Sequence, residues 1–152
     1  MRAVRGDGLV GSEMPAVRQQ INIAASPRTV WRALTTADGL TSWWVDEARV
    51  DARSGGRIVL VSEGDDGEPM EERGVFLEVR PTRKLEIAWD STGKALTKGS
   101  RVQFQIARDG DETRLLVVHS GGEALEDEEI NEQITKGWRA ALRALRSALE
   151  DS

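Results

Sequence analysis

The chain has 152 residues, a formal net charge of −5 and no cysteine. A single domain of this size buries enough surface to fold without crosslinks, and the lack of cysteine excludes disulfides and thiolate metal sites. The single histidine excludes a multi-histidine metal site, and the interspersed charges give no basic face for nucleic acid. No apolar run reaches the ~18 residues of a membrane span. We therefore expect a cytoplasmic protein with no metal, no cofactor, no nucleic-acid partner and no membrane insertion.

The N-terminal sixteen residues contain three glycines and show no hydrophobic periodicity. They also lack the apolar stretch of a signal peptide. We interpret residues 1–16 as a flexible tail in front of a single domain at 17–150. An additional edge element or a self-association arm is the alternative interpretation of this segment.

A strand and two short helices are predicted to open the domain. Alternating apolar residues indicate a strand at 17–24. Ser26 and Pro27 have the pattern of a helix start, because serine caps the first turn and proline lacks an N–H that this position does not need. A second short helix is predicted to follow and to hold Trp43 and Trp44.

Six more strands and a long helix complete the predicted order of elements. Turn residues separate the apolar segments and place strands near 46–51, 56–63, 71–79, 83–90, 100–108 and 112–119. Strands that follow one another without intervening helices are typical of an antiparallel sheet. At 124–150, large apolar residues recur every three or four positions, which predicts a helix with one apolar face. The predicted fold class is α+β, with about seven strands and a long C-terminal helix.

The orientation of the last strand depends on the turn before it, because the strand is apolar on both phases. Phe104 lies on the apolar phase of the preceding strand, which faces the core. A two-residue turn at Asp109-Gly110 pairs Phe104 with Leu115 and places both side chains on the same face. By alternation, Val117 and His119 then point inward as well. A four-residue loop gives the same orientation, whereas a three-residue loop reverses it.

Several segments, in this order along the chain, resemble one protein family. They are residues 26–35 (SPRTVWRALT), Trp43-Trp44, Gly55-Gly56-Arg57, residues 74–81 (GVFLEVRP) with Leu85 and Trp89, Thr113-Arg114-Leu115, His119-Ser120-Gly121 and Gly137-Trp138. Their order and spacing are similar to the family named after the activator of heat-shock protein 90 ATPase, in the START-like or SRPBCC superfamily. The resemblance implies a helix-grip fold, in which a curved antiparallel sheet wraps round the C-terminal helix and leaves a pocket between them.

The resemblance implies less about activity than about fold. Superfamily relatives bind lipids, sterols or polyketides, and a few act on aromatic polyketides. The co-chaperones of the family suggest a different role, in which a chaperone-like or stress-related protein is the partner. The sequence leaves both a monomer and a homodimer open.

We predict a non-catalytic site for a small hydrophobic ligand, lipid-like or aromatic, between the sheet and the C-terminal helix. Inward-facing strand residues form one wall, the helix forms the other, and the tryptophan pair lies at the rim. The candidate ligand-binding residues are Trp43, Trp44, Phe76, Trp89, Phe104, Leu115, Val117, His119, Ile134 and Trp138. For the aromatic residues among them, plain core packing is the alternative.

His119 has the one side chain in this chain whose ordinary pKa lies near neutrality. Three roles are open to it: orienting the polar end of a ligand, acid–base catalysis, or a hydrogen bond to a backbone group. No catalytic residue is assigned. The acidic residues at 123–129 are expected at a helix start because they favour the positive end of the helix dipole, so we predict no metal site there.

Two other functions compete with the ligand container. The first is a co-chaperone-like or stress-related protein-interaction module, which should show an exposed apolar patch instead of a deep cavity. The second is an enzyme of the polyketide cyclase or aromatase type, with His119 in the pocket.

Overall fold

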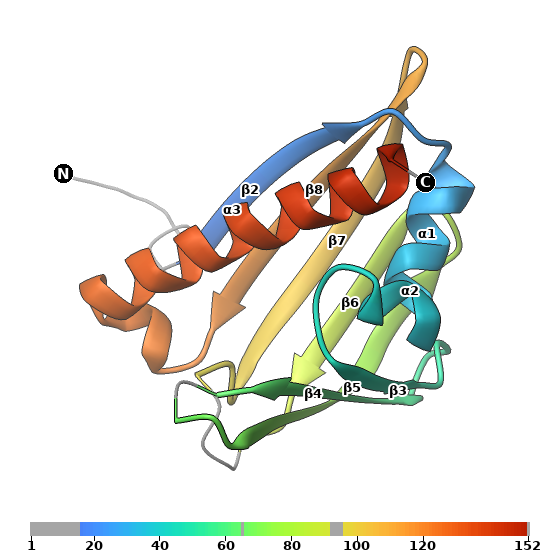
Figure 1. Ribbon diagram of the computed structural model, residues 1–152. Coiled ribbons are helices and arrows are strands. Elements are labelled where there is room, and N and C mark those ends of the chain that lie inside the picture. The colour runs from blue at the N-terminus through green and yellow to red at the C-terminus, as the bar shows by residue number, and fades with distance from the viewer. Residues whose placement is uncertain (1–15, 65, 92–95, 152) are drawn as a thin grey trace, which may run out of the picture.

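The computed structural model describes residues 16–64, 66–91 and 96–151, which form an antiparallel sheet with a long helix across it (Figure 1). The strands are β2 (Ala16–Ile23), β3 (Glu47–Val50), β4 (Arg57–Glu63), β5 (Pro69–Arg80), β6 (Lys84–Trp89), β7 (Ser100–Asp109) and β8 (Glu112–Gly121). The helices are α1 (Pro27–Thr35), α2 (Ala37–Thr41), the 3-10 turn η2 (Ala124–Glu126) and α3 (Glu128–Glu150). The predicted α+β class, with a sheet of seven strands and a long C-terminal helix, is confirmed.

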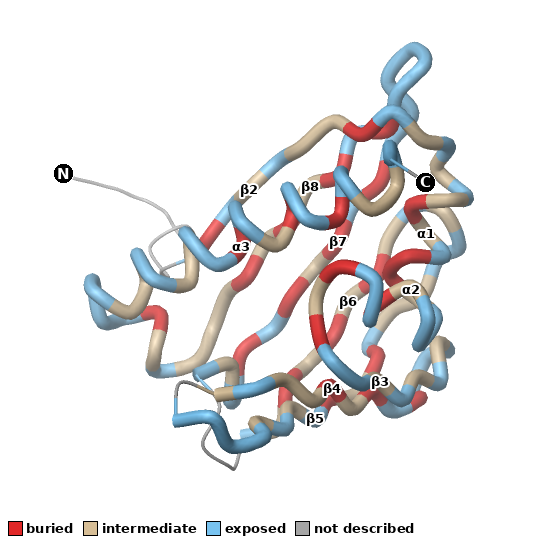
Figure 2. The backbone as a smooth tube through the Cα atoms, viewed as in Figure 1, coloured by how far each residue is buried: buried red, intermediate tan, exposed pale blue. Residues whose placement is uncertain are grey.

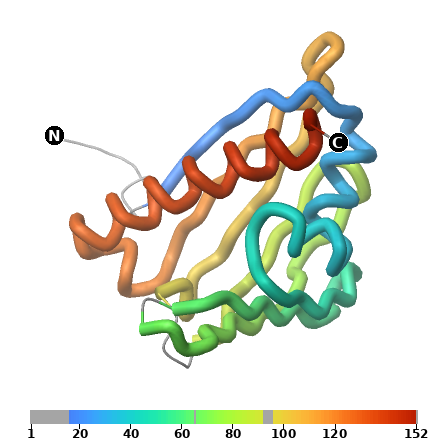
Figure 3. The backbone as a smooth tube through the Cα atoms, in the orientation of Figure 1, coloured from blue at the N-terminus to red at the C-terminus, as the bar shows by residue number. Residues whose placement is uncertain are grey.

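The sheet is continuous, with the strand order β2-β8-β7-β6-β5-β4-β3 and antiparallel pairing at every step. Because β2 pairs with β8, the beginning of the described chain lies against its last strand. The N-terminal strand and the C-terminal helix also run side by side, as the blue and red segments of Figure 3 show. The sheet curves round α3 in the predicted helix-grip arrangement, and α1 and α2 lie beside it on the same face (Figure 1).

Both α1 and α3 begin at residues whose side chains satisfy free backbone N–H groups. The Ser26 hydroxyl accepts a hydrogen bond from the N–H of Thr29 at 3.1 Å, with proline in the first turn as predicted. The Asp127 carboxylate accepts from the N–H groups of Glu129 and Ile130 at 2.9 and 3.1 Å. The last helix therefore starts at 128, four residues later than predicted, and the residues before Asp127 form η2.

The tryptophan pair lies outside the second short helix, in which it was predicted. Helix α2 ends at Thr41, and Trp43 and Trp44 occupy the turn that follows it. The Trp43 ring is buried, and its Nε1–H donates to the backbone carbonyl of Ala33 at 2.9 Å. This bond ties the turn to α1.

The β7–β8 hairpin has the predicted face but a different register. Phe104 pairs with Val117, and Val102 pairs with His119, so the strands are shifted by two residues from the predicted pairing. The reason lies in the turn. Gly110 has a positive φ of 63° and stands first of the two turn residues, the position at which a type II′ turn requires glycine. A shift of two residues preserves the inward direction of each side chain.

The core lies between the concave face of the sheet and the helices (Figure 2). Buried residues alternate along the central strands, as in β6, where Leu85, Ile87 and Trp89 are buried. On α3 the buried residues are Trp138, Leu142 and Leu145. The apolar stripe predicted for this helix therefore packs against the sheet.

The predicted tail can be compared with the structure only at its end. Residues 1–15 lie outside the described residues, and Ala16, the last residue assigned to the tail, already pairs with Ser120 as the first residue of β2. Among the helices of the described residues, none combines the length and the apolar character needed to cross a membrane.

Candidate functional site

A pocket of about 500 Å³ lies beside α3, where the helix faces the turn after α2 and the inner side of β5. Its lining residues are Trp43, Trp44, Glu72, Leu96, Thr97, His119, Ile134, Gly137, Trp138, Ala140, Ala141 and Ala144. Side chains from α3, from two strands and from two connecting segments thus meet at one site.

Three tryptophans form a continuous aromatic wall of this pocket. Trp43 and Trp44 are stacked, with ring centroids 5.1 Å apart, and Trp44 lies 5.3 Å from Trp138. Phe104 supports the cluster from the sheet through edge-on contacts at 6.2 Å to Trp44 and 5.8 Å to Trp138. Offset and edge-on contacts at such distances are the favourable geometries for aromatic pairs. The rings therefore hold one another in place and present a preformed apolar surface.

The helical wall of the pocket is made of small residues. Gly137, Ala140, Ala141 and Ala144 are spaced by three, one and three positions, which places them on one side of α3. These side chains reach only a short distance from the helix, and the space that larger residues would fill remains open. The adjacent side of the helix carries the buried residues of the core.

The polar end of the pocket contains a chain of hydrogen bonds centred on His119. The indole Nε1–H of Trp138 donates to His119 Nδ1 at 3.1 Å. Because an indole nitrogen can only donate, Nδ1 carries no proton and the neutral ring is protonated at Nε2. Nε2–H then donates to Ser100 Oγ at 2.8 Å, and the Ser100 hydroxyl donates to the Thr97 carbonyl. Each member of the chain has a partner.

Burial holds His119 in its neutral form. The side chain is 1% exposed, and desolvation lowers its pKa from 6.5 to about 4. Both ring nitrogens are engaged in hydrogen bonds. At neutral pH this histidine is a structural group that orients Trp138, and it has no free nitrogen with which to accept a proton.

Glu72 brings a carboxyl group from β5 into the pocket. Its Oε2 accepts a hydrogen bond from the Thr97 hydroxyl at 2.6 Å. Desolvation raises the pKa of Glu72, and the hydrogen bond from Thr97 opposes this rise. A titratable group in a mostly apolar pocket is a candidate for recognising a polar group on a ligand.

The structure brings half of the sequence-predicted site residues together at the pocket. Trp43, Trp44, His119, Ile134 and Trp138 line it. The others belong to the buried core and do not line it, with exposures of 4% or less: Phe76, Trp89, Phe104, Leu115 and Val117.

Several lining residues were not predicted from the sequence. For the small residues of α3, the signal is their spacing on one side of an otherwise amphipathic helix. For Glu72, the signal is an acidic side chain on the same phase of its strand as Gly74 and Phe76, which are buried. Leu96 and Thr97 follow a connecting segment and carry no such pattern.

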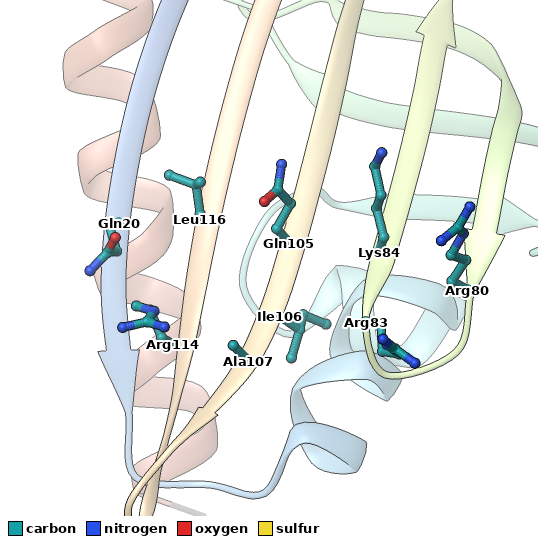
Figure 4. Close-up of a pocket in the computed structure, with 9 residues that line it drawn as sticks. All are labelled: Gln20, Arg80, Arg83, Lys84, Gln105, Ile106, Ala107, Arg114 and Leu116. Atoms are coloured by element: carbon teal, nitrogen blue, oxygen red, sulfur yellow. The ribbon is translucent and has the colours of Figure 1, made fainter.

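A second pocket, of about 470 Å³, lies on the face of the sheet that points away from α3 (Figure 4). Its lining residues are Gln20, Arg80, Arg83, Lys84, Gln105, Ile106, Ala107, Arg114 and Leu116. Arg80 and Lys84 both pair with Glu78, with Lys84 Nζ 3.1 Å from the carboxylate. The polar, cationic surface of this groove does not suit an apolar ligand, and none of the predicted site residues lines it.

Metal ligation has no support in the part of the chain that the structure describes. No three His, Asp or Glu side chains among those residues are grouped so that they could hold an ion. Of the acidic residues before α3, Asp127 has the helix-capping role described above.

The family model for activator of Hsp90 ATPase homolog 1-like proteins matches residues 24–150. The chain belongs to this family. The resemblance inferred from the sequence segments is thereby confirmed, and among the described residues the match covers every helix and every strand except β2. No curated protein matches the chain by sequence.

Solved structures of similar proteins share the fold. The solution structure of the Aha1 dimer from Colwellia psychrerythraea is 23% identical, with a TM-score of 0.76 over 90% of this chain and 97% of that one. Protein NE0264 from Nitrosomonas europaea is 20% identical, with a TM-score of 0.77 over 93% and 97% of the two chains. CalU16 from Micromonospora echinospora is 25% identical, with a TM-score of 0.67 over 90% and 85%. These likenesses establish the architecture.

Proposed function

We propose that this protein binds a small apolar ligand, aromatic or lipid-like, in the pocket beside α3 and catalyses no reaction. The observation that carries the proposal is the pocket of about 500 Å³ walled by three tryptophans. Ligand pockets typically enclose ~300–1,000 Å³ and combine apolar walls with a few polar groups. Here the polar groups are Glu72, Thr97 and His119.

The state of His119 favours binding over a cyclase-like reaction. An acid–base catalyst needs a pKa near the working pH and a nitrogen within reach of the substrate. The pKa of His119 is about 4, and both its nitrogens are occupied by Trp138 and Ser100. Polyketide cyclase or aromatase activity based on this histidine is therefore the weaker candidate.

A protein partner is the second candidate, because the pocket opens to solvent and Leu96 at its edge is 50% exposed. An apolar side chain beside an open pocket offers a surface on which a partner could pack. In this alternative the partner is a chaperone-like protein or a second copy of the chain.

The test is a binding measurement with a pocket-filling variant. Naphthalene derivatives with neutral, cationic and anionic substituents are titrated into the full-length protein by calorimetry. Ala141→Leu should weaken binding at least tenfold, because the larger side chain extends into the space beside the tryptophans. Gln133→Leu is the matched control: it adds a leucine at an exposed position of α3 outside the pocket and should leave the Kd within twofold. No binding of any derivative, or equal loss in both variants, would leave the protein-partner function in the lead.

A further inference from the structure

Glu72 is the single acidic residue among the described residues that line the pocket. Of the described residues that line the pocket, Glu72 and His119 alone carry titratable side chains, and His119 is neutral at pH 7. The remaining lining residues are apolar except for Thr97, whose hydroxyl donates to the Glu72 carboxylate. A ligand that fills this pocket meets one carboxyl group and no described cation.

The neighbours of Glu72 on its own strand do not neutralise it. Glu71 and Arg73 lie on the opposite phase of β5 and pair with each other on the outer face. Across the sheet, Glu72 pairs with Leu60, which is buried and apolar. Within the described residues, the structure records no ion pair at Glu72. Glu72 is half-buried, and removing a carboxylate from water without a cationic partner is costly, so a bound cation would relieve that cost.

The walls around Glu72 suit the rest of such a ligand. Trp43, Trp44 and Trp138 supply apolar contact area, and indole is the aromatic ring that attracts cations most strongly. The small residues of α3 leave room opposite these rings for a flat or compact body.

Resting on the proposed ligand pocket, we propose that the ligand is an apolar amine, with its ammonium group beside the Glu72 carboxylate and its body against the tryptophans. The chemical class is a protonated or quaternary amine on an aromatic or aliphatic body. Fatty acids and other anionic amphiphiles are disfavoured by the same carboxylate. This pocket should therefore prefer cationic ligands among the apolar molecules that fit it.

Three naphthalene probes of nearly equal shape test this preference: 1-naphthylmethylamine, 1-naphthalenemethanol and 1-naphthoate. Titrated into the full-length protein at pH 7 by calorimetry, the amine should bind at least tenfold more tightly than the alcohol, and the naphthoate should bind most weakly. Glu72→Gln should remove the advantage of the amine over the alcohol. Glu71→Gln is the matched control, because it removes the same charge from the outer face of the same strand, and it should preserve the preference.

The outcomes separate this inference from the function on which it rests. Equal affinity for amine and alcohol, tightest binding of naphthoate, or an amine preference that survives Glu72→Gln would overturn the inference and leave the pocket intact. If none of the three probes binds, the proposed ligand pocket itself fails, and the inference fails with it. If Glu72→Gln does not fold, an equal or reversed ranking of the probes in the wild-type protein still overturns the inference.

Discussion

His119 shows how far the role of one residue can be predicted from the sequence. Alternation along the hairpin places its side chain inward, and the structure confirms that it is buried. Its hydrogen-bond partners, Ser100 and Trp138, each lie 19 positions away and come from different elements. The pattern of one strand fixes the direction of a side chain, but its partners depend on how the elements pack.

The buried histidine should make the fold sensitive to acid. Burial lowers the pKa of His119 from 6.5 to about 4, so the folded protein excludes a proton that the unfolded chain accepts. Above pH 6.5 the ring is neutral in both states and contributes nothing to the pH dependence. As the pH falls from about 6.5 towards 4, protonation of the unfolded chain lowers the free energy of unfolding by roughly 3 kcal/mol in total. Urea denaturation at pH 7, 5.5 and 4.5 measures this loss.

The His119→Gln variant isolates this contribution. Burial raises the pKa of Glu72, so this carboxyl binds its proton more readily in the folded protein and stabilises the fold on acidification. The contribution of Glu72 has the opposite sign and is present in both proteins, so it cancels in the comparison. Equal acid sensitivity in the wild type and the variant would contradict the assigned state of His119.

At the level of elements, the sequence predicts which side chains face the core better than it predicts the turns between elements and the ends of helices. In the β7–β8 hairpin, the alternation of apolar residues fixes which side chains face the core, but the pairing depends on which residue occupies the turn. Gly110 takes the position that needs a positive φ, and this choice shifts the register by two residues. The second short helix shows the same limit, because α2 ends at Thr41 and the tryptophan pair predicted for it lies in the turn that follows.

The start of α3 should depend on Asp127. This carboxylate accepts hydrogen bonds from two backbone N–H groups that have no partner within the helix. Asp127→Ala should lower the free energy of unfolding by about 1 kcal/mol, the typical cost of losing an N-terminal cap. Chemical denaturation measures the change. Glu126→Ala removes an exposed acidic residue outside the cap and should cost less, so equal losses in the two variants would assign the effect to charge alone.

At the scale of the molecule, the pocket was predicted in its position and only partly in its lining. In the sequence, large aromatic residues are the obvious candidates for a pocket lining, but a cavity forms where the side chains are small. Gly137, Ala140, Ala141 and Ala144 leave the space, and Trp43 and Trp44 come to it from a distant turn. Phe104 and Trp89 were natural candidates, yet tight packing against their neighbours places them in the core. Only the assembled fold shows which residues pack in the core and which line the pocket.

Helix α3 contributes residues both to the core and to the pocket. Substitutions on its two sides should therefore change the stability of the fold and the affinity for a ligand separately. Leu142 is 2% exposed and faces the core, whereas Ala141 lines the pocket. Adjacent positions on a helix point about 100° apart, because one turn contains 3.6 residues. Leu142→Ala should therefore lower the free energy of unfolding by about 2–5 kcal/mol while the Kd for a naphthalene probe stays within twofold.

The neighbouring substitution should behave in the opposite way. Ala141 lines the pocket and is only partly buried, so Ala141→Leu should change the free energy of unfolding by less than about 1 kcal/mol while weakening binding at least tenfold. Denaturation and calorimetry on the same two variants give both quantities. If Leu142→Ala reduced affinity as strongly as Ala141→Leu, the pocket would depend on the packing of the whole core. The division of α3 into a core side and a ligand side would then be wrong.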